Sequence, residues 1–321
     1  MPDIPAISVV IPLYNKESYI AGALNSIFSQ TSQDFEVIVV DDGSTDGGME
    51  VVKEFRDPRI RLIQQENRGV SAARNRGIEA ARSELIAFLD ADDEWLPLFI
   101  ETILRLRSLY PNAGLYGTAY EVHYPGSIVQ KVYNKSEGER LLSSFFGALV
   151  EFGSAIFNSS SSAAPKEILM RFGGYPIGVK WNEDGTLWGK IALKYPIAYS
   201  PVICSIYRQY TGNNSIGITE YIENPFVQYL SNIPKNELLK LSYFRDLMEY
   251  SDLCRLEAIS RNIFSGHGAR ARTELLLVKA SCLSRKKHML QFFSYVPPIF
   301  MDFVRKHART LSYIKRKIIR E

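Results

Sequence analysis

Three carboxylates fall within four positions in the segment FLDADDEW, which runs from residue 88 to residue 95. They are Asp90, Asp92 and Asp93, and like charges this close repel one another and resist desolvation. Two carboxylates in the pattern Asp-x-Asp can bind a divalent cation while leaving coordination positions for the oxygens of a diphosphate. The segment therefore indicates either a solvated loop or helix cap, or a metal and phosphate site.

A second polar group, DDGSTD at residues 41–46, directly follows the apolar run from Phe35 to Val40. One interpretation is functional: Asp42 would accept a hydrogen bond from a ring N–H of a pyrimidine base. The other is structural: the segment starts a helix, and Ser44 or Thr45 is its N-cap. Both interpretations can hold in the same protein.

A third group, NRGVSAARN at residues 67–75, places Arg74 on a predicted helix. Its guanidinium either lies against a nucleotide and its diphosphate or forms an ordinary surface salt bridge. These two interpretations predict different surroundings, because the first needs a site at a strand end and the second needs only solvent.

A fourth group, WNEDGTLW at residues 181–188, places Asp184 and Trp188 four positions apart and therefore on one face of a helix. A carboxylate beside an indole suits a sugar, whose C–H face stacks on the ring while the carboxylate takes a hydroxyl proton. The alternative is an acidic first turn that complements the helix dipole above a core tryptophan.

The first three groups follow strands in a regular alternation of strands and helices. Apolar runs predict buried strands, and apolar residues at helical spacing predict the helices between them. The expected strands are Ser8 to Ile11, Phe35 to Val40, Arg59 to Gln64 and Leu85 to Leu89, and the expected helices cover residues 20–28, 45–55 and 71–81 and a fourth opened by Pro97. This order predicts an α/β fold, a doubly wound, mixed and mostly parallel sheet flanked by helices, with ligands at the carboxyl ends of its strands.

After residue 112 the pattern changes. Strands are expected at residues 114–123, 128–133 and 197–207, helices at residues 136–151 and 183–195, and a short helix opened by Pro165. NSSSS at residues 158–162 is interpreted as a loop near the site. From about residue 225 onward the periodicity is helical. We therefore expect an α/β domain at residues 1–222 and a helical C-terminal region at residues 223–321.

The composition of the 321-residue chain is that of a soluble globular protein, with 46% hydrophobic and 23% charged residues. A net charge of +3 does not by itself imply nucleic acid as a partner. The three cysteines are far apart and lack the spacing of a zinc site, which indicates reduced thiols. Because the N-terminus does not resemble a signal peptide and no apolar run reaches membrane-spanning length, a cytoplasmic location is expected.

The segment at residues 298–321 is basic and amphipathic. Apolar residues on one helical face oppose arginines on the other: Phe300, Val304, Leu311, Ile314 and Ile318 against Arg305, Arg309, Arg316 and Arg320. Such a helix can lie in a membrane interface, attracted to anionic lipid, which would make the protein peripheral at the cytoplasmic membrane face. The alternative is a helix packed on the first domain with a solvated charged face. Nucleic acid is disfavoured as a partner, because stacking aromatics beyond Tyr313 are not interleaved with the arginines.

Five segments together resemble the family 2 inverting glycosyltransferases of GT-A fold. They occur in family order over about the first two thirds of the chain: SVVIPLYN at residues 8–15, VVDDGSTD at 39–46, ENRGVSAARNRGI at 66–78, FLDADDEW at 88–95 and NEDGTLWGKIA at 182–192. The resemblance implies an enzyme that moves a hexosyl or N-acetylhexosaminyl group from a UDP-sugar donor to an acceptor hydroxyl, with inversion at the anomeric carbon. Synthesis of polysaccharide, cell-envelope or lipid-linked glycan would be its setting.

The resemblance also implies a role for each matching residue. The donor nucleotide would be contacted by Pro12 and Tyr14, which form a wall for the uracil, by Asp42, which reads its N–H, and by Asn67, Arg74, Asp90 and Ala91. A Mn²⁺ or Mg²⁺ ion would be held by Asp92, the direct ligand, and by Asp90. Asp184 would be the general base, Glu183 would contact a donor or acceptor sugar, and Trp188 would be the acceptor platform. Residues 1–110 would bind the nucleotide and residues 111–222 a glycan or lipid-linked acceptor.

One segment departs from the family pattern. Many members carry a histidine near a Tyr-Arg pair after the last strand, as a further metal ligand, whereas residues 207–210 of this chain read YRQY. The metal would then be held by Asp92, diphosphate oxygens and water alone, or bound weakly.

Other functions need different residues. A non-catalytic nucleotide-sugar-binding protein of the same fold is the alternative, and the intact Asp90, Asp92 and Asp184 argue against it. A nucleotidyltransferase or a nicotinamide-dependent enzyme would need a glycine-rich phosphate loop after the first strand, where this chain has PLYNKE.

Overall fold

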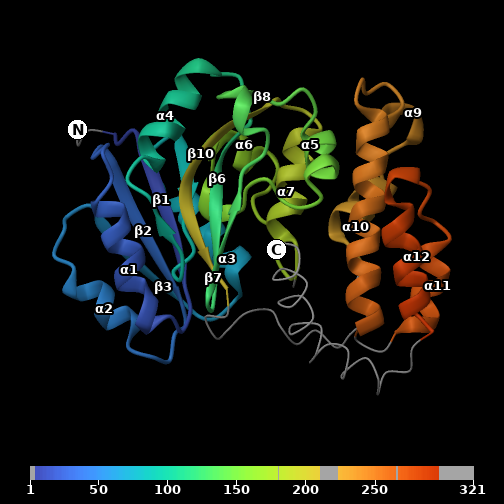
Figure 1. Cartoon of the computed structure of the whole chain (residues 1–321). Helices are drawn as coiled ribbons and strands as arrows, with labels where there is room; N and C mark the ends of the chain where they lie inside the picture. Colours follow the sequence, from blue (N-terminus) through green and yellow to red (C-terminus); the bar gives the residue numbers. More distant parts are fainter. Residues whose placement is uncertain (1–3, 180, 210–222, 265–266, 296–321) are drawn as a thin grey trace. The chain divides into compact units, whose positions relative to one another are not determined.

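The computed structural model describes residues 4–179, 181–209, 223–264 and 267–295. The chain divides into two compact units, Met1–Asn214 and Ser215–Glu321 (Figure 1). The first unit contains a mixed sheet with its helices, and the second is helical. The sequence places the boundary at residue 222 and divides the first domain at residue 110, and these two positions remain predictions.

One sheet organises the first unit. Its strands within the described residues are β1 (Ile7–Leu13), β2 (Phe35–Asp42), β3 (Ile60–Gln65), β4 (Leu85–Phe88), β5 (Glu94–Trp95), β6 (Leu115–Tyr124), β7 (Ser127–Lys131), β8 (Arg140–Leu141), β9 (Ser162–Pro165) and β10 (Ile197–Arg208). Their order is β3-β2-β1-β4-β9-β6-β10-β5, with β7 on β6 and β8 on β10. Strands β3, β2, β1 and β4 are parallel, and so are β6 and β10, whereas β9 is antiparallel to both its neighbours. The predicted mixed α/β sheet is confirmed.

Helices flank this sheet. They are α1 (Glu17–Phe28), α2 (Gly48–Glu54), α3 (Val70–Ala80), α4 (Phe99–Leu109), α5 (Phe145–Phe152), α6 (Lys166–Arg171) and α7 (Glu183–Ala192), and 3₁₀ turns cover Lys135–Glu137 and Ser159–Ser161. Helix α3 packs on β1 and β2, and α4 packs on β6 and β10. The spacing of apolar residues that predicts α1 is confirmed, because Ile20, Leu24 and Ile27 are its buried face.

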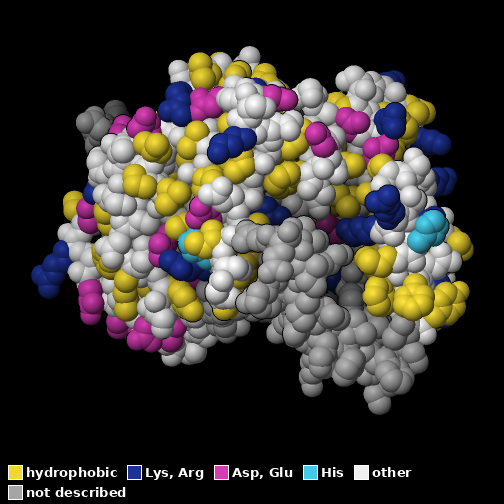
Figure 2. Space-filling view, viewed as in Figure 1, with side chains coloured by type: hydrophobic (Ala, Val, Ile, Leu, Met, Phe, Trp, Pro, Cys, Tyr) yellow, Lys and Arg dark blue, Asp and Glu magenta, His cyan; other side chains and the backbone are white. Residues whose placement is uncertain are grey.

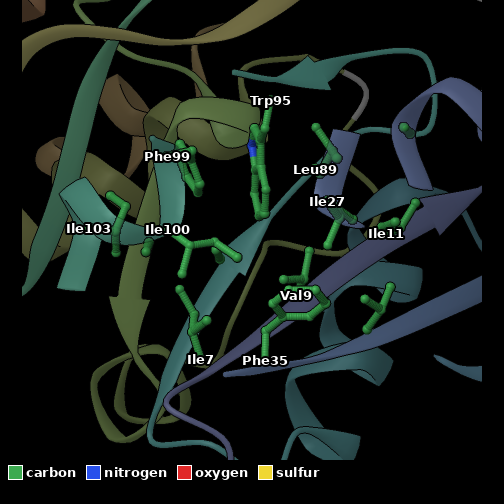
Figure 3. Packing of buried hydrophobic residues seen from close by; sticks show 14 of the residues in the cluster. Ile7, Val9, Ile11, Ile27, Phe35, Leu89, Trp95, Phe99, Ile100 and Ile103 are labelled. Atoms are coloured by element: carbon green, nitrogen blue, oxygen red, sulfur yellow. The ribbon is translucent and has the colours of Figure 1, made fainter. Parts of the chain in front are cut away.

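Strand β1 supplies side chains to both faces of the sheet. Val9 belongs to a core cluster with Ile27 of α1 and Phe99 of α4 (Figure 3). Its neighbour Val10 faces α3, where a Cβ added to Gly77 would lie 2.2 Å from the Cγ1 of Val10. Successive side chains along a strand point to opposite faces. The strand is therefore covered on both sides, which explains why each of its residues except Ser8 is apolar.

The first strand extends beyond Ile11, the end that the sequence predicts, and includes Pro12. Strand β1 continues to Leu13, and Pro12 stays in register with Val40 of β2. On the other side, the pairing of β1 with β4 stops at Val10. A proline at this position has no ladder partner on that side, so its missing N–H is tolerated.

Other local predictions are also corrected. The expected helix at residues 136–151 is a 3₁₀ turn, the short strand β8 and then α5, which begins after Ser144, whose Oγ accepts a hydrogen bond from the N–H of Gly147. The predicted loop at residues 158–162 is a 3₁₀ turn that leads into β9. Neither Ser44 nor Thr45 is an N-cap, because α2 begins after Gly47 and Asp46 accepts the N–H of Gly48.

The second unit is helical where it is described, as predicted. Its helices are α8 (Pro225–Ser231), α9 (Lys235–Leu238), α10 (Phe244–Phe264), α11 (Gly268–Leu275) and α12 (Ser284–Phe293), with a 3₁₀ turn at Ser281–Leu283. A small core is formed by apolar residues from α10, α11 and α12: Leu256, Ile259, Ile263, Leu275 and Leu290. The basic segment at residues 298–321 lies outside the described residues. Among the described helices, none combines the length and apolar character needed to cross a bilayer.

The surface carries charges of both signs. On the face drawn in Figure 2, Lys and Arg side chains are interspersed with Asp and Glu side chains. This mixture agrees with a net charge of only +3 over the chain.

Candidate active site

The loops that follow β1 and β2 are tied together at the carboxyl edge of the sheet. Asn15 has a left-handed backbone conformation, with φ of 50°. Its N–H donates to Ser44 Oγ at 3.1 Å, and its Oδ1 accepts the N–H of Thr45 at 2.7 Å. Asparagine tolerates this conformation better than most residues. The turn after β1 is therefore held in place by the turn after β2.

Asp42 holds the turn that follows β3. Its buried carboxylate accepts hydrogen bonds from Gln65 Nε2 at 2.7 Å, from the N–H of Arg68 at 2.9 Å and from the N–H of Gly69 at 2.8 Å. Gly69 has a positive φ of 86° and precedes the first turn of α3. The structure thus gives Asp42 a scaffolding role, and its reading of a uracil stays a prediction.

The other predicted nucleotide contacts differ in exposure. Tyr14, just beyond β1, is 41% exposed, and Asn67 is exposed on the turn after β3. Pro12 is buried within β1, and Ala91 belongs to the buried core cluster. Of these four side chains, those of Tyr14 and Asn67 are accessible to a ligand.

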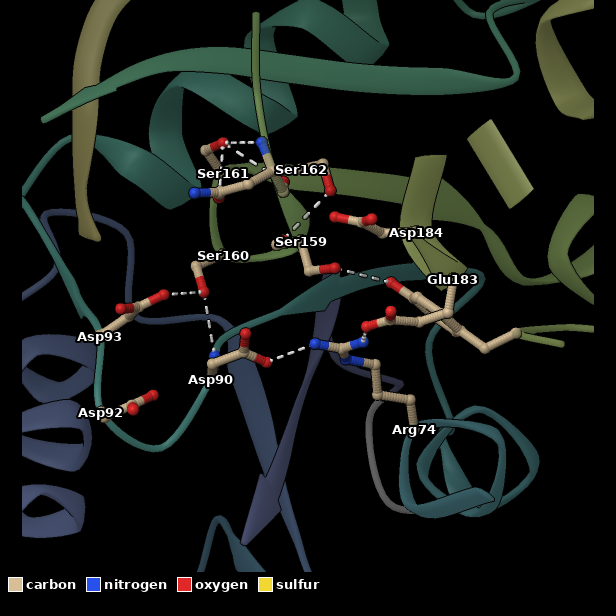
Figure 4. Close-up of polar contacts among 12 residues, drawn as sticks. Arg74, Asp90, Asp92, Asp93, Ser159, Ser160, Ser161, Ser162, Glu183 and Asp184 are labelled. Carbon is tan, nitrogen blue, oxygen red and sulfur yellow. Dashed lines mark hydrogen bonds and ion pairs between the residues drawn. The ribbon is translucent and has the colours of Figure 1, made fainter. Parts of the chain in front are cut away.

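Arg74 connects the acidic segment after β4 to the first turn of α7. Its side chain is 3% exposed and forms ion pairs with Asp90 Oδ1 at 2.7 Å and Glu183 Oε1 at 2.9 Å (Figure 4). Its guanidinium also lies 4.8 Å from the ring centroid of Tyr175, within cation–π range. The surface interpretation of Arg74 is therefore wrong, because this arginine is buried between two acids that are far apart in the sequence.

The three acids of FLDADDEW have different partners. Asp90 pairs with Arg74, whereas Asp92 Oδ2 lies 2.6 Å from Lys16 Nζ. Asp93 is 1% exposed, and the N–H of Arg208 donates to it at 2.9 Å. Mutual repulsion is thus relieved within the chain, since Asp90 and Asp92 each lie beside a cationic side chain and Asp93 accepts a backbone hydrogen bond.

Ser160 is a residue of this site that sequence reasoning missed. Its hydroxyl donates to Asp93 Oδ2 at 2.5 Å and accepts the N–H of Asp90 at 3.1 Å (Figure 4). Four consecutive serines look equivalent in the sequence, and only the fold shows which one faces the acids. Ser160 therefore fixes the backbone of the acidic segment against the 3₁₀ turn that leads into β9.

Burial raises the pKa of two of these acids. For Asp93 the loss of solvation is the main cause, and the charges of Asp90 and Asp92 raise its pKa further, well above the usual range. For Asp90 burial also raises the pKa, while the neighbouring Arg74 guanidinium opposes the shift. Asp93 thus binds a proton more readily than an aspartate in water does.

Asp184 lies at the start of α7, beside Glu183. Its Oδ1 accepts the N–H of Gly185 at 2.7 Å. Burial, and next the charge of Glu183, raise the pKa of Asp184 to about 6, against the opposing effect of Arg74. A general base works best when its pKa lies near the operating pH. The environment of Asp184 therefore suits the transfer of a proton.

Trp188 does not form an open platform. Its side chain is 2% exposed and packs against Phe88 and Tyr175, with ring centroids 6.2 and 5.6 Å away. The prediction that its indole stacks on an acceptor sugar is wrong, and the alternative, a core tryptophan beneath an acidic first turn, describes the structure. The physical reason is that the apolar face of α7 must be buried against β4 to complete the core.

The described residues do not complete a metal site by themselves. No group of three His, Cys, Asp or Glu side chains among them is arranged to hold an ion. Asp92 forms an ion pair with Lys16, and Asp90 forms one with Arg74. The carboxylate of Asp93 accepts a hydrogen bond from the buried hydroxyl of Ser160. The predicted pair Asp92 and Asp90 therefore faces cations of the chain itself.

Comparison with known proteins adds to this geometry. Residues 8–170, about half of the chain, match the sequence model of Glycosyl transferase family 2. The chain belongs to this family. A relative of this family 2 chain, an uncharacterized glycosyltransferase of Nostoc sp., is 30% identical over 221 residues, which cover 65% of the chain and 66% of the relative. The family 2 chain spans only part of several curated relatives, from 14% to 66% of their length.

Solved structures share the fold of this family 2 chain. TarS of S. aureus, residues 1–349 in complex with UDP-GlcNAc, matches with a TM-score of 0.62 and 17% identity, covering 94% of the chain and 92% of TarS. The mannosyltransferase PcManGT from Pyrobaculum calidifontis, in complex with GDP-Man and Mn²⁺, matches with a TM-score of 0.55 and 19% identity, covering 91% and 86%. At these identities the likeness concerns the fold, and it confirms the predicted GT-A architecture.

Proposed function

We propose that this chain is an inverting glycosyltransferase that moves a hexosyl or N-acetylhexosaminyl group from a UDP-sugar to an acceptor hydroxyl. Membership of family 2 supports sugar transfer from a nucleotide donor. The likeness to TarS, solved with UDP-GlcNAc, supports a uridine nucleotide. Synthesis of polysaccharide, cell-envelope or lipid-linked glycan is the setting we propose, with a glycan or a lipid-linked glycan as acceptor.

The observation that carries the proposal is the chain of ion pairs Asp90–Arg74–Glu183 beside Asp184. Asp90 follows β4, where the donor diphosphate is expected, and Glu183 and Asp184 open α7. Arg74 forms an ion pair with Asp90 at 2.7 Å and another with Glu183 at 2.9 Å. A proton-accepting carboxylate is thereby held at a defined place relative to the donor acids, as a two-substrate reaction requires.

The reaction we propose is a single displacement. Asp184 removes the proton of the acceptor hydroxyl as the hydroxyl oxygen attacks the anomeric carbon from the face opposite the diphosphate. The new carbon–oxygen bond forms while the bond from the anomeric carbon to the diphosphate oxygen breaks, so the configuration inverts. A positioned base of this kind contributes about 10²- to 10⁴-fold to the rate. Arg74 and Glu183 act on Asp184 through its charge environment.

Transfer is expected to depend on pH through Asp184. Its pKa of about 6 means that the carboxylate, the form able to accept a proton, predominates only above that pH. We expect kcat/KM to fall roughly tenfold for each pH unit below the pKa and to level off above it. The variant Glu183→Gln lacks the negative charge that helps to raise the pKa of Asp184, so the midpoint of its pH–rate profile should move to lower pH. UDP release measured from pH 4.5 to 8.5 checks this, and a midpoint that rises in Glu183→Gln would contradict it.

A donor screen tests the proposed function directly. The protein is incubated with a panel of UDP-, GDP- and dTDP-sugars, and the released nucleoside diphosphate is measured. We expect release from at least one UDP-sugar, faster than from the GDP- and dTDP-sugars. Binding of a UDP-sugar without release from any donor would instead favour the alternative, a non-catalytic nucleotide-sugar-binding protein of the same fold.

Two finer predictions remain open to experiment. A Mn²⁺ or Mg²⁺ ion on Asp92 and Asp90 is supported by the Mn²⁺ in the PcManGT complex, and against it stands the pairing of both acids with cations of this chain. An anionic membrane surface as partner of residues 298–321 rests on the sequence alone, because these residues are outside the described ones.

A further inference from the structure

Lys16 lies at the donor end of the site, although the sequence motifs assign it no role. Its Nζ is 2.6 Å from Asp92 Oδ2, and the two residues are 76 positions apart in the sequence. The two side chains are only 11% and 15% exposed. Exposed ion pairs are screened by water and contribute little, whereas a shielded pair is strongly coupled. The ion pair between Lys16 and Asp92 is therefore expected to be a stable part of the site and not a transient surface contact.

The backbone around Lys16 fixes its position. The left-handed conformation of Asn15 reverses the chain after β1, and Lys16 is the residue immediately before α1. The hydrogen bond from the N–H of Thr45 to Asn15 Oδ1 ties this turn to the loop after β2. The ammonium also lies 5.8 Å from the ring centroid of Tyr19, where a cation–π attraction is favourable. Lys16 is thus directed across the end of β1 toward the acidic segment.

Lys16 contacts the one acid of the segment that the family resemblance makes the direct metal ligand, Asp92. Asp90 is paired with Arg74, and Asp93 is hydrogen bonded to Ser160 and to the N–H of Arg208. The family resemblance makes Asp92 the direct metal ligand, yet its Oδ2 faces an ammonium at contact distance. A divalent ion on the same oxygen would sit within a few ångströms of that ammonium, and like charges so close repel strongly in a shielded site.

We propose that Lys16 is the resident cation of the donor site, where it neutralises Asp92, binds the diphosphate of the donor and competes with a divalent ion for Asp92. The diphosphate part rests on the proposed function. Lysine suits the role, because its ammonium is a compact point charge with three rotatable donors, on a stem flexible enough to contact a carboxylate and a phosphate together.

The competition is tested by titrating the full-length protein with Mn²⁺ in the absence of nucleotide and measuring free Mn²⁺ by electron paramagnetic resonance. We expect Lys16→Met to bind Mn²⁺ at least roughly tenfold more tightly than the wild type, because a repelling charge is removed. Lys53→Met, at an exposed lysine of α2 paired with Glu50, is the matched control and should bind Mn²⁺ as the wild type does. Unchanged Mn²⁺ affinity in Lys16→Met would overturn the competition.

The diphosphate contact is tested by UDP binding in EDTA, measured by isothermal titration calorimetry. We expect Lys16→Met to bind UDP roughly tenfold or more weakly than the wild type, as loss of a charge-assisted hydrogen bond predicts, and Lys16→Arg to retain most of the affinity. Equal UDP affinity in the wild type and Lys16→Met would overturn this part. Circular dichroism melts confirm that each variant is folded, and Lys16→Gln replaces the methionine variant if that one is not.

The two measurements separate this inference from the proposed function. A wild-type protein that binds no UDP, with or without Mn²⁺, would overturn the uridine donor and the diphosphate contact together. The Mn²⁺ titration uses no nucleotide, so it would still decide whether Lys16 and a divalent ion compete for Asp92.

Discussion

Asp184→Asn is expected to lower the rate of sugar transfer by at least about 100-fold and to leave UDP affinity nearly unchanged. The amide has the same shape as the carboxylate, and its oxygen can still accept the N–H of Gly185, which Asp184 Oδ1 accepts at 2.7 Å. It cannot, however, accept the proton of the acceptor hydroxyl. The expected loss therefore concerns chemistry and not folding.

The measurement pairs steady-state transfer with calorimetric UDP binding on the same preparation. Glu167→Gln, at an exposed carboxylate on α6, is the matched control and should transfer sugar at the wild-type rate. Transfer by Asp184→Asn within a few fold of the wild type would remove Asp184 from the role of base. A loss of transfer together with a loss of UDP binding would indicate instead that the site has been distorted.

Arg74→Leu is expected to lower the free energy of unfolding by about 3–5 kcal/mol. The substitution removes one cation from between Asp90 and Glu183 and leaves both carboxylates without their strongest partner. The two carboxylates are 29% and 19% exposed, so water solvates part of their charge, but the loss of a shared cation from a largely shielded site is still a large single-site penalty. Arg74 also opposes the raised pKa of Asp184, so the pH midpoint of any remaining transfer should move upward.

Urea denaturation of the wild type, Arg74→Leu and Arg76→Leu checks this prediction. Arg76 is on the same helix, but its ion pair with Glu79 is exposed, so Arg76→Leu should change stability by no more than about 0.5 kcal/mol. Similar losses in the two variants would mean that the effect comes from helix α3 in general. Adding Glu183→Gln to Arg74→Leu should restore part of the stability, because one unpaired charge disappears.

Much of this protein can be predicted from its sequence. The mostly apolar runs that give β1 and β2 predict these strands correctly, because a parallel strand covered on both faces consists mainly of apolar residues, with Ser8 and Glu36 as buried, hydrogen-bonded exceptions. Polar residues directly after those runs must lie at the carboxyl edge of the sheet. The family, the fold and the segments that meet at the site all follow from these local patterns, and the comparisons confirm the first two.

The partners of the charged side chains could not be predicted in this way. Arg74 is 109 positions from Glu183, and Lys16 is 76 positions from Asp92, so neither ion pair has a local signature. Helical spacing correctly places Asp184 and Trp188 on one face of α7, but it does not say what covers that face. Packing against Phe88 and Tyr175 decides that the indole belongs to the core.

The segment FLDADDEW shows which properties of the site can be predicted from the sequence and which depend on tertiary packing. From the sequence alone its three acids indicate either a solvated loop or helix cap, or a metal and phosphate site, because carboxylates so close together need solvent or cations. Which partner each acid receives depends on the tertiary fold, which brings Lys16 before α1, Arg74 of α3 and Ser160 of the turn before β9 together around the end of β4. Local composition thus determined that charge gathers there, and tertiary packing decided how that charge is neutralised.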